Sequence, residues 1–201
     1  MKTIFPLLLL LTGLFVSGCG PQVTTAQPTN ADLSSYSTFA YLPNADIKLR
    51  NDSMDQDMVN TRVIETVNIE MEKQGYQLDR DNPDLLVLIN VYTEQDTSTS
   101  EDPVYASYPY GTYGITRVSP YYNNFYYNGF ASYGGVVGYD RDTREYTEGT
   151  LIISLVDRMS KKTVWKGMTS KAIYSGSTTD EIVKLVDNIF DEYPMTRGRA
   201  K

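Results

Sequence analysis

Hydrophobic residues recur along this chain with two different periods, and the periods predict where helices and strands form. Between residues 55 and 74, apolar side chains return every three or four positions, which is typical of an amphipathic helix with one buried face. The same spacing from Ile182 to Phe190 predicts a second helix. This helix must end before Pro194, because proline cannot donate the backbone hydrogen bond that a continuing helix needs.

Capping residues support the bounds of both helices. Ser53 with Gln56, and Thr178 with Glu181, have the spacing of a capping box, in which each side chain accepts a hydrogen bond from the other residue's backbone N–H. Gly75 follows the first helix, at the position where a left-handed backbone commonly ends a helix. The sequence therefore predicts two complete helices.

Strands are predicted on either side of the first helix and before the second. Residues 36–42 are aromatic and β-prone, and residues 85–91 (LLVLINV) form an aliphatic run that suits a central strand buried on both faces. Residues 151–156 and 163–174 flank a turn-like segment and predict a hairpin. The order strand, helix, strand, insertion, strand, strand, helix predicts an α+β two-layer sandwich. We expect about four strands in a mostly antiparallel sheet, with both helices on one face.

Residues 94–148 form an insertion rich in tyrosine, glycine and asparagine. Eleven of the 17 tyrosines of the chain lie between Tyr105 and Tyr146, without a sustained period. This composition is typical of binding loops, because tyrosine offers a large amphipathic contact at small entropic cost. The insertion could contact sugar rings, a membrane headgroup layer or a protein, and the alternative is a disordered surface loop. The strongest candidate contact residues are Tyr121, Tyr122, Phe125, Tyr126 and Tyr127.

The first 18 residues have the composition of a signal peptide. Lys2 precedes a largely apolar run over residues 4–16, which is too short to span a bilayer as a helix. Residues 16–19 (VSGC) resemble the bacterial lipobox. The resemblance implies cleavage between Gly18 and Cys19 and acylation of Cys19, with a diacylglyceryl group and a further chain such as palmitate.

The residues after the lipobox indicate where the protein is sent. Gly20 stands where an aspartate would retain a lipoprotein in the inner membrane, which implies the outer membrane, facing the periplasm. Residues 19–31 contain two prolines and no apolar period, so they predict a flexible tether ahead of a domain over residues 32–194. Residues 195–201 predict a disordered tail.

The composition removes several classes of function. The 201 residues include no histidine and one cysteine, which excludes a histidine-dependent triad, an imidazole zinc site and an intramolecular disulfide. The net charge of −7 argues against a nucleic-acid partner, because phosphate binding needs a basic surface. We expect neither a metal nor a cofactor.

Three features are candidate sites that have plainer structural explanations. Two acidic clusters could bind a cation or supply the carboxylates of a hydrolase, but both lack the EF-hand glycine and glutamate, and we interpret them as solvated turns. The clusters are Asp79, Asp81 and Asp84, and Asp140, Asp142 and Glu145. Trp165, the only tryptophan, could stack on a sugar or peptide, but its place within a strand favours packing in the core or at a sheet edge.

Several short strings, taken in order, resemble the DUF4136 family of bacterial lipoproteins, a family of unknown function. The resemblance covers residues 32–194 apart from the insertion, and it implies an envelope lipoprotein without catalytic residues to assign. We therefore expect a lipid-anchored, non-enzymatic binding or assembly module, and the main alternative is a peptidoglycan- or glycan-binding lipoprotein. The strings are Tyr36-Ser-Thr-Phe39, Gly75-Tyr76, Pro83-Asp-Leu-Leu-Val87, Gly149-Thr-Leu-Ile-Ile-Ser-Leu-Val-Asp157, Val164-Trp-Lys-Gly167 and Tyr193-Pro194.

Overall fold

The computed structural model describes residues 22–42, 56–92, 102–106, 124–129, 135–140, 149–170, 173 and 177–194. The elements in chain order are β1 (Gln22–Ala26), a 3-10 helix η1 (Leu33–Ser35), β2 (Thr38–Tyr41), α1 (Gln56–Lys73), β3 (Gln77–Leu78), β4 (Leu85–Tyr92), β5 (Asp102–Ala106), β6 (Gly135–Asp140), β7 (Thr150–Asp157), β8 (Thr163–Ser170) and α2 (Thr179–Asp191).

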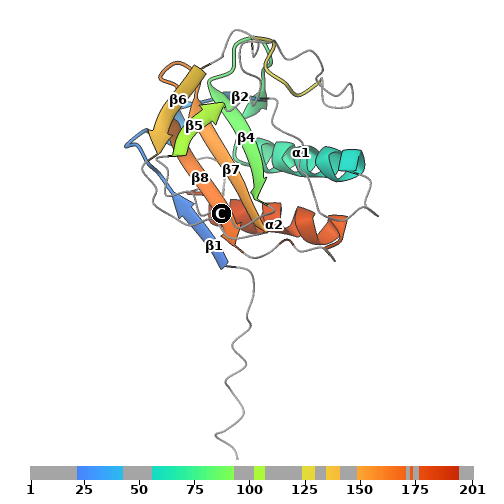
Figure 1. Ribbon diagram of the computed structural model, residues 1–201. Helices are drawn as coiled ribbons and strands as arrows, with labels where there is room; N and C mark the ends of the chain where they lie inside the picture. The colour runs from blue at the N-terminus through green and yellow to red at the C-terminus, as the bar shows by residue number, and fades with distance from the viewer. Residues whose placement is uncertain are drawn as a thin grey trace, which may run out of the picture.

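Six of the strands form one open, mixed sheet with the order β1-β8-β7-β4-β2-β3 (Figure 1). The pairs β1–β8, β8–β7 and β7–β4 are antiparallel, whereas β4–β2 and β2–β3 are parallel. The α+β class is confirmed, but the expectation of about four mostly antiparallel strands was wrong. The parallel pair β2–β4 is possible because α1 returns the chain across the sheet between them, as parallel neighbours require.

The first strand lies where a flexible tether was expected. Residues 22–26 pair with β8 in an antiparallel register that runs from Gln22 opposite Ser170 to Ala26 opposite Lys166. Val23 is half-buried against the hydrophobic core. The tether over residues 19–31 is thus interrupted by an edge strand, which has too few buried side chains to show a hydrophobic pattern. The ordered domain begins at β1 rather than at residue 32.

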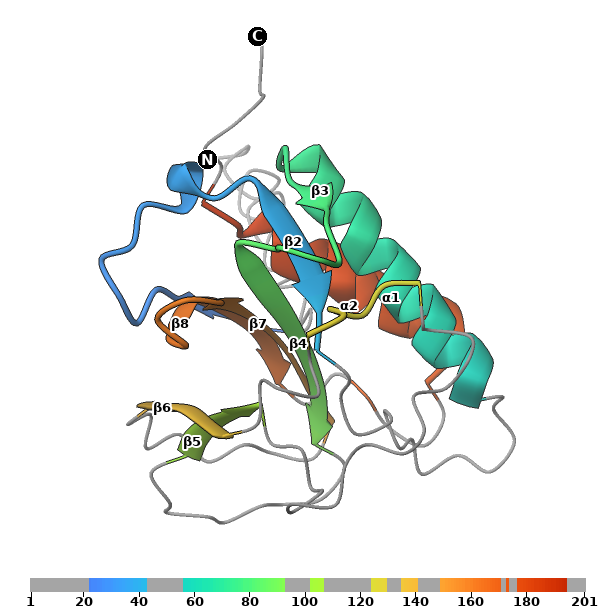
Figure 2. The same cartoon turned by 90° about the horizontal axis from the view of Figure 1, so that it is seen from above.

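Both helices cover the same face of the sheet (Figures 1 and 2). The α1 helix ends as predicted, with Gly75 in a left-handed conformation at a φ of 90°. The Gly75 N–H donates to the Glu72 carbonyl over 2.9 Å, and the N–H of Tyr76 donates to the Met71 carbonyl over 3.1 Å. The predicted capping box of Thr178 and Glu181 begins α2. Ser53 lies outside the described residues, so the first capping box stays a prediction.

The central strand β4 is buried on both faces, as predicted. Leu85 and Val87 belong to the core beneath the helices, whereas Leu86 and Leu88 alternate with them and are buried on the opposite face. The same opposite face of β7 and β8 is buried at Ile152, Ser154, Lys166 and Met168. The paired strands β5 and β6 lie on this side of the sheet, away from the helices (Figure 2).

Candidate functional site

One of the three described parts of the insertion, residues 124–129, is built into the edge of the main sheet, whereas the other two form the separate pair β5–β6. Strand β3 covers only Thr38 and Phe39 of β2, and Tyr126 forms a parallel bridge with Tyr41 just beyond. The Tyr41 N–H donates to the Phe125 carbonyl over 3.0 Å, and the Tyr41 carbonyl accepts the N–H of Tyr127 over 2.9 Å. The insertion therefore closes an edge that would otherwise expose unpaired backbone groups.

Arg80 holds this segment from the side. Its Nε donates to the Tyr126 carbonyl over 2.9 Å, and its Nη2 donates to Asn128 Oδ1 over 2.9 Å. Asn128 in turn donates its backbone N–H to the Arg80 carbonyl over 2.8 Å and its Nδ2 to Asp81 Oδ1 over 2.6 Å. A planar guanidinium can make both side-chain bonds in one orientation, so Arg80 acts as a fork. We call Arg80, Asp81, Tyr126 and Asn128 the insertion clamp.

The clamp buries two of the aromatic residues that the sequence analysis proposed for binding. Tyr126 is 8% exposed and belongs to the core, and Phe125 packs half-buried, edge-on against Tyr41 with ring centres 6.0 Å apart. These two side chains hold the insertion in place and are not an open contact surface. Tyr127 is half-buried, with its ring so close to Gly129 that an added Cβ there would lie 2.4 Å from it.

The other two candidate aromatic residues of the insertion, Tyr121 and Tyr122, lie outside the described residues. Cys19 and Gly18 of the lipobox do as well. Their proposed roles therefore stay predictions from the sequence.

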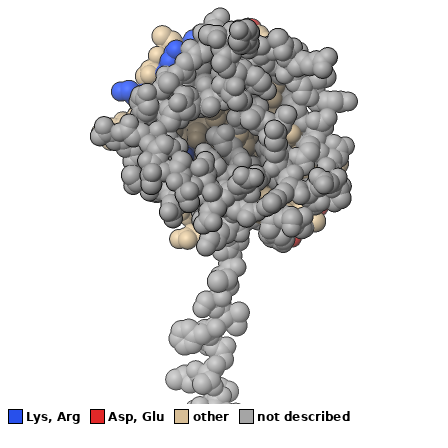
Figure 3. All heavy atoms as spheres, in the orientation of Figure 1, with Lys and Arg blue, Asp and Glu red and all other residues tan. Residues whose placement is uncertain are grey.

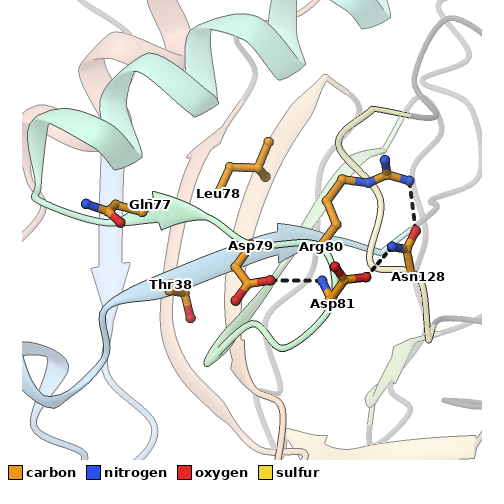
Figure 4. Close-up of a pocket in the computed structure, with 7 residues that line it drawn as sticks. All are labelled: Thr38, Gln77, Leu78, Asp79, Arg80, Asp81 and Asn128. Atoms are coloured by element: carbon orange, nitrogen blue, oxygen red, sulfur yellow. Dashed lines mark hydrogen bonds between the residues drawn. The ribbon is translucent and has the colours of Figure 1, made fainter.

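A polar pocket of about 480 Å³ lies beside the clamp. Figure 4 shows the Arg80 and Asn128 side chains pointing toward each other at one side of it, with the Asp81 carboxylate beside them and hydrogen-bonded to Asn128. The residues that line the pocket are Thr38, Gln77, Leu78, Asp79, Arg80, Asp81 and Asn128. They come from β2, from β3 and the loop that follows it, and from the insertion, so three distant parts of the sequence meet here.

The carboxylates of the first acidic cluster hold the backbone in shape. Asp79 Oδ1 accepts the N–H of Asn82 over 3.0 Å and that of Asp81 over 2.9 Å, and these hydrogen bonds hold the pKa of the Asp79 carboxyl below its usual value. Asp84 Oδ2 accepts the N–H groups of Ser37 and Thr38 over 2.7 and 3.1 Å. Asp79 shapes its own turn, while Asp84 ties the start of β4 to the start of β2.

These contacts agree with structural turns rather than with a cation site. Within the parts of the chain that the structure describes, no three His, Cys, Asp or Glu side chains are grouped to hold a metal ion. The second acidic cluster cannot be placed, because Asp142 and Glu145 lie outside the described residues and the side chain of Asp140 is not described.

Trp165 lies in the core, as the preferred interpretation predicts. It is fully buried, with its ring centre 4.8 Å from that of Tyr193 and 5.7 Å from that of Phe190. No face of the indole is open to a sugar or peptide. The hydroxyls of Tyr193 and Tyr76 lie 2.8 Å apart, and burial raises the pKa of Tyr193 above its usual value. The cluster packs α2 against β8.

None of the helices found in the described ranges is both long and apolar enough to cross a bilayer.

Comparison with solved structures finds the same fold in a DUF4136 family protein from Bacteroides thetaiotaomicron. The two chains are 16% identical, the similarity covers 87% of this chain and 96% of that one, and the TM-score is 0.54. A PDZ domain protein from Parabacteroides distasonis is 16% identical over 88% of this chain and 36% of its own, with a TM-score of 0.46. The PelC dodecamer from Paraburkholderia phytofirmans is 9% identical over 85% and 94%, with a TM-score of 0.40.

Comparison with curated proteins gives no significant match. The model of the DUF4136 family, a domain of unknown function, matches residues 23–195. This range begins within β1, in agreement with the structure and earlier than the sequence analysis placed the domain. The chain therefore belongs to the DUF4136 family.

Proposed function

We propose that this protein is a lipid-anchored lipoprotein of the bacterial cell envelope, held in the outer membrane by acylated Cys19 and facing the periplasm. Its domain acts as a non-enzymatic binding or assembly module, and the tyrosine-rich insertion is its contact surface. The lipobox supports the anchor. The observation that carries the binding role is the insertion clamp, because it attaches the insertion to the rigid sheet at a point between its two ends.

A contact loop works best when a rigid scaffold holds its base. Here the insertion leaves the sheet after β4, is bonded to β2 through residues 124–129, and returns at β7. Tyr121 and Tyr122 stand three and two positions before residues 124–129 in the sequence. Such a loop loses less conformational entropy on binding than one that is fixed only at its ends.

The polar pocket does not support a hydrolase. Asp79 Oδ1 accepts two backbone N–H groups, and so does Oδ2 of Asp84, which is not among the residues that line the pocket, so both carboxylates have a structural role. A general acid would need a raised pKa, whereas the pKa of Asp79 is lowered. We propose a partner protein of the envelope as the ligand of the contact surface.

In-cell photocrosslinking tests this proposal. A photoreactive residue replaces Tyr122, and a matched control variant carries it at Met159, which is 78% exposed on the turn between β7 and β8. We expect one dominant protein adduct from position 122 that is missing from position 159. Glycan adducts from position 122 would replace the protein partner with a cell-wall ligand. Equal adducts from both positions, or none, would refute the contact role of the insertion.

Lipidation is tested separately. Cys19→Ala should leave an uncleaved precursor without the lipid mass, whereas the natural protein should carry it. A mature protein of normal size in the variant would refute the lipobox and the anchor with it.

A further inference from the structure

The register of the main sheet brings the start of β1 and both connections of the insertion to one end. Gln22 begins β1 opposite Ser170, the last residue of β8, and Tyr92 ends β4 opposite Thr150, the first residue of β7. Because β7 and β8 are antiparallel neighbours, these two pairs lie at the same end of the sheet (Figure 1). We call the end that contains these four residues the β1 end of the sheet.

Very little chain separates the proposed lipid anchor from this end. Only Gly20 and Pro21 lie between Cys19 and Gln22. Three fully extended residue steps reach about 11 Å, whereas a tether through residue 31 would reach about 40 Å. The headgroup layer of one leaflet is roughly 5–8 Å thick, so about half to three-quarters of the shorter reach is used inside it.

Strand β1 is held firmly enough to keep this connection short. All five of its residues are in register with β8, and Val23 packs against the core. Lengthening the connection would require β1 to leave the sheet, with the loss of its ladder hydrogen bonds and of the Val23 contacts. Strand β1 is thus a fixed spacer in the folded protein.

We propose that the β1 end of the sheet lies directly against the lipid headgroups of the leaflet that holds the Cys19 acyl chains, with the domain standing end-on. This inference rests on the proposed acylation of Cys19. The start of β8 lies about 23 Å from the β1 end, at about 3.3 Å per residue. The turn between β7 and β8 therefore points away from the leaflet, because the connection to the anchor is shorter than the strand.

The same geometry places the base of the insertion at the membrane surface. The insertion leaves β4 and re-enters β7, which stand three and two strand positions from β1. With neighbouring strands about 4.8 Å apart, both connections lie within about 15 Å of the start of β1. Only the two chain connections of the insertion lie at this end, because the clamped residues are bonded to Tyr41, which pairs with Val87 of β4, five residues before Tyr92.

Fluorescence quenching on vesicles tests the orientation. Cys19 is the only cysteine and its thiol is acylated in the lipoprotein, so a single introduced cysteine can carry the probe. Gln22→Cys places the probe at the β1 end, and Met159→Cys places it on the turn at the opposite end, both at exposed positions. The acylated mature protein is incorporated into phosphatidylcholine vesicles that carry a quencher on some headgroups.

Zwitterionic lipid is chosen because the described Lys and Arg side chains visible in Figure 3 gather at its upper left edge, toward the turn between β7 and β8. An anionic leaflet would attract these basic side chains and so draw the turn between β7 and β8 toward the membrane, against the orientation that the short connection favours. We expect strong quenching at position 22 and little at position 159. A flexible Gly/Ser segment as long as the expected tether, inserted between Pro21 and Gln22, should abolish the difference.

Each other outcome overturns the inference in a distinguishable way. Equal quenching at both positions would mean that the domain lies flat. Quenching at neither position, in protein that floats with the vesicles, would mean that β1 does not hold the domain near the leaflet although the anchor is present. Protein that fails to float with the vesicles would refute the anchor itself, and the proposed localisation with it.

Discussion

The face of the main sheet at β8 and its edge at β2 are covered by different kinds of contact. At β8, the side chain of Trp165 packs against Phe190 and Tyr193 of the C-terminal helical region, and the contacts are mainly apolar. At β2, the edge is closed by the insertion clamp, in which Arg80 and Asn128 exchange hydrogen bonds across 48 positions of sequence. The apolar contact at β8 is formed by residues with a regular spacing, whereas the polar contact at β2 depends on single residues that meet only in the folded chain.

The largest loss of stability is expected from removing the Trp165 ring from the apolar contact at β8. Trp165→Ala removes a fully buried ring and should lower the free energy of unfolding by about 3–5 kcal/mol. Denaturant unfolding measures this. Trp165→Phe is the matched control and should lose less, because it keeps an aromatic ring in the cluster. If Trp165→Ala costs no more than Trp165→Phe, the cluster does not hold α2 on the sheet.

Adding a side chain at Gly167, in the same apolar contact, should lower stability by a smaller amount. A Cβ on Gly167 would lie 2.5 Å from Ile189 Cγ2 and 2.6 Å from Trp165 Cη2, which is closer than packed atoms approach. Gly167→Ala should therefore lower the free energy of unfolding by about 1–3 kcal/mol. The control is Thr25→Ala. Thr25 is an exposed residue of β1 that pairs with Gly167 of β8, and its replacement should change stability by at most about 0.5 kcal/mol. Equal changes would contradict the close approach of α2.

Breaking the clamp should have a smaller and more local effect. Arg80→Ala removes two hydrogen bonds from the insertion and should lower stability by about 1–2 kcal/mol. Hydrogen exchange should rise in residues 124–129 and at Tyr41, but not in α2. Arg80→Lys, which keeps the charge without the planar fork, should rescue little. Unchanged exchange in residues 124–129 would show that the clamp is not needed to hold the insertion.

The smallest effect concerns pH at the pocket. The pKa of Asp79 is lower in the folded than in the unfolded protein, so its carboxylate stabilises the fold above the unfolded pKa of about 4 and loses this effect as pH falls through the folded pKa. Asp79→Asn should therefore be less stable than the natural protein at pH 7, and the difference should shrink as the pH is lowered below 4. A difference that is independent of pH would contradict the role of the charge.

Much of the helix-bearing half of the fold was predictable from local pattern. The apolar spacing of α1 and α2, the capping box at Thr178 and the left-handed Gly75 are all short-range features, and each predicts its own element. The aliphatic run of β4 predicted burial on both faces. These features were accessible because neighbours in sequence are neighbours in the element.

The remaining features depend on pairings between distant residues. Val23 is the one residue of β1 that packs against the core, so β1 shows no alternation and was taken for a tether. Tyr126 has the same composition around it as Tyr121 and Tyr122, yet it is part of the core. Composition could mark the insertion as unusual, but it could not single out Phe125 and Tyr126 as aromatic residues that anchor it to the sheet.

The sequence by itself determined the two helices, the hairpin of β7 and β8, the family and the proposed lipid anchor, because each depends on a short run of residues. Only the tertiary structure decided the mixed order of the six strands, the clamp on the insertion and the pairing of β1 with β8. The physical reason is the same in each case. An edge strand or a polar clamp is stabilised by hydrogen bonds whose partners are far apart in the chain, and backbone hydrogen bonding has no sequence pattern of its own.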